Sequence, residues 1–180
     1  MAAWASLDRD TQMKWIEYET TAEPHRPPFD HKAHISGNNL FVSAYHGFAT
    51  LGDEHIPSPQ RFVSFPPFAV TMGDAVRLDG ALLIPAHVVI ADGLAARRYR
   101  LLAKLQLTEP GKGKHPGYLR NYLADANCDA REVRILVPGY LNTWGLYLDT
   151  YQVHAQFILI DNVTGYRSQS HQQSFILSVR

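Results

Sequence analysis

The stretch YRLLAKLQLT, residues 99–108, decides the fold class of this chain. Its odd-numbered residues, from Tyr99 to Leu107, are apolar, and its even-numbered residues are charged or polar except for Leu102. Successive side chains of a β-strand point to opposite faces. This period of two therefore predicts a strand with one face on a core and the other face in water.

The same period of two returns further along the chain, in residues 151–159 and 173–179. The turn-rich segment 161–165 between them has the length of a hairpin connection, so we expect the two strands to pair antiparallel. Tyr151 opens the first of these strands shortly after Leu148. The tyrosine of a Greek-key corner occupies this place in immunoglobulin-like folds.

Asp79-Gly80 predicts a second hairpin, because both central positions of the favoured two-residue turn need a positive φ. Its strands should lie at 76–78 and 81–84, with further strands near residues 65–70, 87–90 and 133–137. About six or seven strands without regular helices between them favour an antiparallel, immunoglobulin-like β-sandwich. A jelly roll is the alternative.

Two short helices are predicted ahead of the strands. Residues from Trp4 to Tyr18 place two indoles, a leucine and a phenol along one helix face, at intervals of three and four. Ser6 or Asp8 can cap the start of this helix, and the prolines of residues 24–28 end it. A second helix should begin in the polar residues that precede Leu40 and stop at a glycine, Gly52, followed by further prolines.

The front of the chain also carries an ordered set of residues: Trp4-x-x-Leu7, Trp15, a proline-bearing spacer, Ser36-Gly37-x-x-x-Phe41-Val42, and Gly52 with prolines soon after. This pattern resembles a helical module of uncharacterised bacterial, prophage and phage proteins. The resemblance covers about the first third of the chain. It implies that an immunoglobulin-like or fibronectin-like β-domain follows and that the protein has a particle-associated or surface structural role. It supplies no catalytic residues.

Composition narrows the classes of protein that the chain can be. It has 180 residues, of which 46% are hydrophobic, and its 17 Lys and Arg balance its 17 Asp and Glu. The zero net charge gives no overall attraction to nucleic acid or to anionic membranes. One cysteine excludes intramolecular disulfides and cysteine-based zinc ribbons. We expect a protein made in the cytoplasm without a signal peptide or membrane span, which can become virion-associated when cells lyse.

The sequence contains none of the familiar nucleotide-binding, hydrolase or zinc-protease motifs, so we expect no enzymatic activity and no cofactor. Nine histidines leave a weaker alternative, a histidine-metal enzyme, because neutral imidazole is a common metal ligand. The candidate ligands are His31, His34, His46 and His55. Scattered surface histidines in a linker are the simpler interpretation.

A basic stretch is the candidate anion site. Its members are Arg97, Arg98, Arg100, Lys104, Lys112, Lys114 and Arg120. If the strand residues share the solvent face and the others extend from the following loop, one edge of the sandwich becomes cationic and can meet phosphate or a polyanion. An ordinary solvated strand face is the simpler interpretation.

A third candidate site is a glycan contact set of Asn142, Trp144 and Tyr147 in a turn-like segment. The indole of Trp144 offers a flat apolar surface on which a sugar ring can stack. Packing of Trp144 into a corner of the fold is the simpler interpretation.

The prediction as a whole is a non-enzymatic structural or interaction protein, with a helical arm at 1–58 and a β-sandwich at 59–180. It would be a subunit or decoration of a phage-like or extracellular assembly, and its partner would be another copy or a host particle. The arm should dock through Trp4, Leu7, Trp15, Leu40, Phe41, Tyr45 and Phe48, because two short helices bury little apolar surface between themselves. A glycan-binding or anion-binding module is the main alternative.

Overall fold

The computed structural model describes residues 2–21, 35–91, 93 and 95–180 and divides the chain into two compact units. Unit 1 comprises residues 1–65 and 160–169, and unit 2 comprises residues 66–159 and 170–180. The predicted boundary between arm and sandwich lies at residue 58, whereas the units divide after Phe65. The chain also returns to unit 1 for ten residues late in the sequence, which no local pattern indicates.

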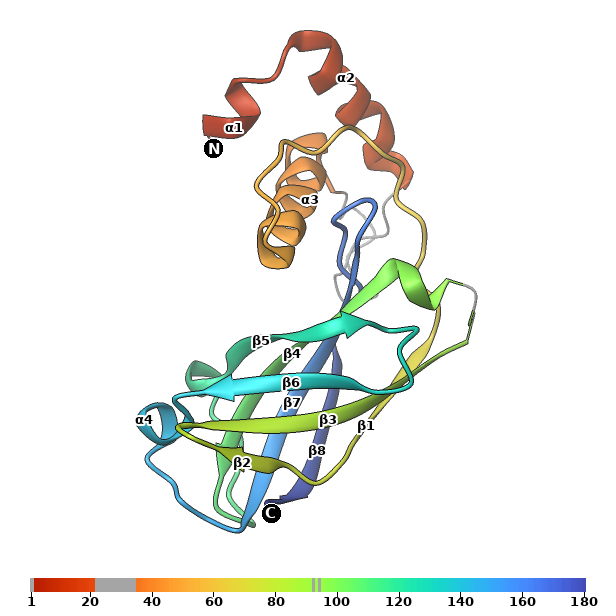
Figure 1. The fold of residues 1–180 in the computed structure, drawn as a ribbon. Coiled ribbons are helices and arrows are strands. Elements are labelled where there is room, and N and C mark those ends of the chain that lie inside the picture. The colour runs from red at the N-terminus through yellow and green to blue at the C-terminus, as the bar shows by residue number, and fades with distance from the viewer. Residues whose placement is uncertain (1, 22–34, 92, 94) are drawn as a thin grey trace. The chain divides into compact units, whose positions relative to one another are not determined.

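Unit 2 is an antiparallel β-sandwich of two four-stranded sheets (Figure 1). In the first sheet the central strand β3 (Ala81–Ile90) pairs on one side with β1 (Phe68–Met72) and β2 (Val76–Leu78), and on the other with β6 (Val133–Pro138). The second sheet has the order β5-β4-β7-β8, formed by Arg120–Asn127, Tyr99–Thr108, Thr150–Asp161 and His171–Ser178. The predicted fold class, including the antiparallel pairing of the last two strands, is confirmed.

Strand β3 corrects one prediction, because the sequence indicated two strands on either side of Pro85. The carbonyl of Pro85 accepts a hydrogen bond from the backbone N–H of Gly73, so this residue faces the neighbouring strands β1 and β2. The missing N–H of proline points to the same side. The position that lacks an N–H therefore lies opposite the gap between β1 and β2. Strand β3 continues through Pro85 without losing a hydrogen bond to either strand.

The buried Tyr151 confirms the predicted Greek-key corner. Its hydroxyl donates a hydrogen bond to the carbonyl of Leu146 at 3.1 Å and accepts one from the backbone N–H of Leu148 at 3.0 Å. The side chain thereby fixes the chain just before β7, as the tyrosine corner does in immunoglobulin-like sandwiches.

Strand β5 was not predicted. Its sequence, RNYLADAN, contains three residues that are disfavoured in strands, Asn121, Asp125 and Asn127, and little alternation. Pairing with β4 holds it in the sheet, with a register shift between Arg100 and Leu102. Tertiary pairing therefore overrides the local preference of these residues.

Unit 1 contains α1 (Ala2–Ala5), α2 (Arg9–Tyr18) and α3 (Gly37–Leu51). Helix α3 confirms its predicted limits, with Ser36 as the N-cap and Gly52 in the left-handed conformation at its end. The prediction of one helix from Trp4 to Tyr18 is wrong, because the segment breaks in two. Asp8 caps α2, as one of the two predicted caps, by accepting a hydrogen bond from the backbone N–H of Thr11.

The core of unit 1 includes the tip of the β7–β8 hairpin. Tyr166 from this tip is buried together with Trp15 of α2 and Phe41 of α3. The hydroxyl of Tyr166 donates a hydrogen bond to the carbonyl of Gln60 at 2.7 Å. The helices therefore bury their apolar surface on a segment that lies more than a hundred residues away in the sequence.

Two glycines allow the hairpin tip to approach α3. A Cβ atom built on Gly47 would lie 1.6 Å from the carbonyl oxygen of Gly165, and one built on Gly165 would lie 2.3 Å from the carbonyl oxygen of Ala44. Gly165 also has a φ of 72°, a conformation that other residues rarely adopt. The backbones of α3 and of the hairpin tip are in direct contact at both positions, so neither position has room for a side chain.

Candidate functional site

The helical residues that the sequence offered to a partner lie in the interior of unit 1. Trp15, Leu40, Phe41 and Phe48 are buried, and Trp4, Leu7 and Tyr45 are half-buried against the same core. Trp4 packs against Phe41 at a tilted angle and Trp15 packs edge-to-face, with ring centroids 5.6 Å and 5.7 Å apart, so both indoles use their surface within unit 1. The expectation that these helices must pack on the sandwich or on a neighbour therefore has an answer within the chain, because the tip of the β7–β8 hairpin packs against them.

The four candidate metal ligands do not all fall within the described chain. His31 and His34 lie outside the described residues. His55 contacts the carboxylate of Asp53 at 2.6 Å, and His46 packs its ring against Tyr45. Among the described residues no group of three or more histidines, cysteines and acidic residues could hold a metal ion.

The basic residues are spread over several elements. Arg97 and Arg98 lie in a 3-10 turn, η2 (Ala96–Arg98), ahead of β4. Arg100 donates hydrogen bonds to the carbonyl of Ala124, Lys114 donates to the side chain of Gln172, and Arg120 donates to two backbone carbonyls nearby. Lys104 and Arg120 fall on opposite faces of the sheet, because Arg120 pairs with Leu105. The expected single cationic edge is therefore divided.

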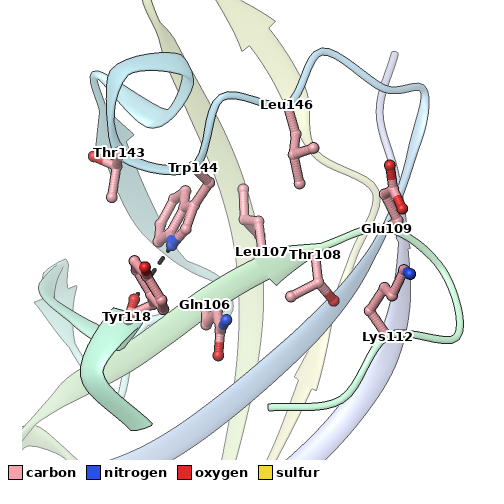
Figure 2. A pocket seen from close by; sticks show the side chains of 9 residues that line it. All are labelled: Gln106, Leu107, Thr108, Glu109, Lys112, Tyr118, Thr143, Trp144 and Leu146. Atoms are coloured by element: carbon pink, nitrogen blue, oxygen red, sulfur yellow. Dashed lines mark hydrogen bonds between the residues drawn. The ribbon is translucent and has the colours of Figure 1, made fainter. Parts of the chain in front are cut away.

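One cavity contains a residue from the candidate glycan site and a residue from the candidate anion site. A depression of about 360 Å³ in unit 2 is lined by Gln106, Leu107, Thr108, Glu109, Lys112, Tyr118, Thr143, Trp144 and Leu146 (Figure 2). Trp144 comes from the glycan set and Lys112 from the basic set. Asn142 and Tyr147 do not line the cavity, and Tyr147 instead stacks on the guanidinium of Arg77 at 3.9 Å.

Trp144 is held in a fixed orientation at this cavity. It is the last residue of α4 (Tyr140–Trp144), and Gly145 ends the helix in the left-handed conformation. Its indole N–H donates a hydrogen bond to the carbonyl of Tyr118 at 3.2 Å, which is drawn in Figure 2. Its ring lies 6.4 Å from that of Tyr122, whose phenol has its pKa raised by burial.

The loop between β4 and β5, which supplies the other side of the cavity, is anchored by two buried polar side chains. Gln106 accepts a hydrogen bond from the backbone N–H of His115 at 2.8 Å. His154 lies 2.9 Å from the carbonyl of Lys112 through Nε2, and 2.7 Å from the hydroxyl of Ser174 through Nδ1. A carbonyl only accepts, so Nε2 carries the proton in neutral His154 and Nδ1 accepts from Ser174. Both ring nitrogens of His154 and the amide oxygen of Gln106 have partners, which explains how these polar side chains are buried on this sheet.

A second feature of unit 2 is the outer face of the first sheet. The even-numbered residues of β3 point into the core, so its odd-numbered residues point outward. Val76, Leu83 and Leu136 stand opposite one another in a cross-strand row on this outer face. We call it the apolar face; its other apolar members are Ala69, Leu78, Ala81, Pro85, Val89 and Pro138.

The apolar face is open to solvent in the folded chain. Val76, Leu78, Val89 and Leu136 are between 43% and 54% exposed. Two pairs of charged residues beside them are paired within the chain, because Arg134 contacts Asp125 at 2.7 Å and Arg180 contacts Asp74. Partial burial acts to raise the pKa of Asp125, but the hydrogen bonds from Arg134 hold that pKa below its ordinary value.

Comparisons with known proteins identify no family for this chain. No family model matches it, and no curated protein matches it. Among solved structures it is similar to the major subunit of aggregative adherence fimbriae type I from Escherichia coli, at 12% sequence identity and a TM-score of 0.33. That alignment covers 67% of this chain and 100% of the fimbrial one.

Sequence reasoning missed the apolar face, although a signal for it was present. Strand β3 reads ALLIPAHVVI, in which His87 is the one polar residue. Such a nearly continuous apolar run is typical of a strand that is buried on both faces. In this chain one face of β3 forms the core and the other is the apolar face.

Within the described residues no helix is long and apolar enough to cross a membrane.

Proposed function

We propose that this protein is a non-enzymatic structural or interaction protein that associates with a second copy of itself through the apolar face. The observation that carries the proposal is the row of Val76, Leu83 and Leu136 across three strands, centred on β3, whose outward residues are apolar except for His87. Contiguous exposed apolar patches on a folded domain mark interaction sites, because their exposure to water is unfavourable.

The charge distribution favours a second copy as the occupant. Arg134, at the border of the face, is paired with Asp125, and the chain as a whole has a net charge of zero. Two identical faces therefore bring no like-charge repulsion when they meet. A two-fold axis would place the same patch on both sides of the interface, as in most homodimers.

The size of the face favours a weak dimer. The four strands of this sheet have 24 residues together, which cover roughly 380 Å² at the usual strand rise and spacing. Two copies would bury roughly 750 to 800 Å² together, which is the size of a weak, transient interface. We expect association that depends on protein concentration.

The resemblance of the helical segment to modules of phage and prophage proteins supports a more specific role, as a subunit or decoration of a phage-like or extracellular assembly. In such a role the sheet-to-sheet contact would join neighbouring copies on a particle. The expected origin, synthesis in the cytoplasm and later association with a virion, belongs to the same proposal.

The test is the mass of the untagged chain in solution, measured by light scattering coupled to size exclusion over a wide range of concentration. We expect the mass to rise from monomer toward dimer. The variant Leu136→Lys should remain a monomer, because an ammonium group within the face cannot be buried without a partner. Ile176→Lys is the matched control, since Ile176 is 55% exposed on β8 in the other sheet, and this variant should still associate.

Three results would overturn the proposal. The first is a native chain that stays monomeric at every concentration. The second is association that persists in folded Leu136→Lys, and the third is association that is lost equally in Ile176→Lys. A second variant, Val76→Lys, repeats the test on another strand of the same face if Leu136→Lys fails to fold.

A further inference from the structure

The cavity beside Trp144 has the features of a small-molecule site, and nothing in the proposed self-association uses it. Its volume of about 360 Å³ lies within the usual range of roughly 300 to 1,000 Å³ for ligand sites. One wall is aromatic and the opposite wall is polar, as Figure 2 shows for Trp144 and Tyr118 on one side and Glu109 and Lys112 on the other.

The aromatic wall is rigid. The indole N–H of Trp144 is held by the carbonyl of Tyr118, so the ring cannot turn without losing this bond. Packing against Tyr122 supports it from another side. The exposed Tyr118 adds a second ring next to Trp144, and this ring packs at a tilted angle against His115 with 4.9 Å between the ring centroids. A fixed aromatic surface of this kind packs well against the C–H face of a sugar ring, and little conformational entropy is lost on binding.

The polar wall offers both kinds of hydrogen-bonding group. The carboxylate of Glu109 accepts hydrogen bonds and the ammonium of Lys112 donates them. Both side chains are exposed, and within the described residues neither has a hydrogen-bond or ion-pair partner. The hydroxyl of Thr143 donates to the carbonyl of Gly139 and keeps lone pairs to accept with. A ligand with several hydroxyl groups can pair with all of these at once.

The loop that carries the polar wall is built to stay in place. The buried side chains of Gln106 and His154 bind its backbone at His115 and Lys112. Each would leave a buried polar group without a partner if the loop moved away, and that loss is unfavourable. Glu109 and Lys112 are thus presented from a loop fixed at two points.

The balance of charge distinguishes between ligand classes. One carboxylate and one ammonium give the lining a net charge of about zero, which disfavours a phosphate or a polyanion. We propose that this cavity binds a neutral pyranose sugar, whose ring stacks on Trp144 while its hydroxyl groups exchange hydrogen bonds with Glu109 and Lys112.

The test is an NMR titration of the full chain with a panel of neutral mono- and disaccharides, and separately with inorganic phosphate and heparin fragments. The three tryptophan indole signals are distinguished by the variant Trp144→Phe. We expect one or more neutral sugars to shift the Trp144 signal and the backbone signals of Glu109 and Lys112 in a saturable way. Neutral ligands release no counterions, so their affinity should hardly change with salt.

Two variants and one control complete the test. Glu109→Gln and Trp144→Ala should each weaken sugar binding by about tenfold or more, because each removes a strong contact. Asn142→Ala is the matched control, since Asn142 is exposed next to the cavity without lining it, and this variant should bind as the native chain does. Glu109→Gln, at an exposed loop position, keeps the test valid if Trp144→Ala fails to fold.

Three outcomes would overturn the proposal. The first is the absence of saturable shifts at Trp144 with every neutral sugar of the panel. The second is binding of phosphate or heparin alone, with an affinity that falls steeply as salt rises. The third is sugar binding that Glu109→Gln and Asn142→Ala affect equally.

Discussion

Unit 1 and unit 2 treat their apolar surface in opposite ways. In unit 1 the large apolar side chains of the helices are enclosed around Tyr166 of the hairpin tip. In unit 2 the first sheet leaves Val76, Leu136 and their neighbours half exposed on the apolar face. By sequence, the helices of unit 1 look as if they need a binding partner, but the hairpin tip of the same chain covers them. The sandwich of unit 2 looks as if it needs none, but one face of its first sheet is left exposed.

A count of apolar residues therefore does not locate an interface. What matters is whether a distant part of the same chain covers them. The helices alone could bury little, but the ten residues 160–169 convert them into a core. The alternation of apolar and polar residues in a strand, in contrast, shows only that one face is buried. It does not show whether the other face contacts a partner.

Gly47→Ala should cause the largest loss of stability, because it disrupts the core of unit 1. In a helix this change is normally stabilising by roughly 1 kcal/mol. Here the new methyl group would lie 1.6 Å from the carbonyl oxygen of Gly165, so we expect a net loss of at least about 3 kcal/mol. Chemical denaturation followed by tryptophan fluorescence measures the loss.

Gly113→Ala is the matched control for that substitution, because a Cβ atom there meets nothing within 4 Å. Its free energy of unfolding should stay close to that of the native chain. A Gly47→Ala protein as stable as the native chain would mean that the hairpin tip does not pack against α3 as described.

Two tyrosines allow the units to be compared with the same chemical change. Tyr151→Phe in unit 2 removes the partner of two backbone groups, whereas Tyr166→Phe in unit 1 removes the partner of one. We expect losses of about 2 to 3 kcal/mol and about 1 kcal/mol respectively. Urea unfolding measures both, with Tyr118→Phe as an exposed control. The interpretation fails if Tyr166→Phe costs more than Tyr151→Phe.

The smallest expected effect concerns Cys128, which is buried in unit 2. Burial raises the pKa of its thiol from 9.0 to about 12. The unfolded chain therefore releases this proton at lower pH than the folded chain does. Stability from this group is complete below about pH 9 and falls as the pH rises toward 12. The loss by pH 9 should be less than about 1 kcal/mol.

Cys128→Ala should remove this part of the pH dependence. Urea unfolding of both proteins at neutral pH and at about pH 9 to 10 measures the difference in slope. Burial also raises the pKa of Tyr166, which adds a loss at still higher pH in both proteins. Equal slopes in the two proteins would show that Cys128 does not titrate differently on folding.

Much of the fold could be predicted from the sequence, because its signals are local. The alternation around Tyr99 gave β4, the Asp79-Gly80 turn gave the β2–β3 hairpin, and Gly52 gave the end of α3. The corner made by Tyr151 followed from its distance to the preceding leucines. Each of these features depends on residues close together in the chain.

The features that could not be predicted depend on contacts between distant residues. Strand β5 exists through its pairing with β4, and β3 passes through Pro85 because the neighbouring edge has a gap there. The joining of Lys112 and Trp144 in one cavity depends on how Gln106 and His154 anchor a loop. No sequence pattern around Lys112 indicates that it lies near Trp144, and none around Trp144 indicates that it lies near Lys112.

The place of Tyr166 in the core of unit 1 also bears on how the protein is made. A ribosome adds about 5 to 20 residues per second, so Tyr166 is synthesised roughly 115 residues, and on the order of ten seconds, after the end of α3. During that time Trp15 and Phe41 have emerged without the residue that encloses them. The nascent N-terminal segment is thus a natural substrate for chaperones that hold apolar chains. Truncated products that lack the last hairpin should be the forms that aggregate in the cell.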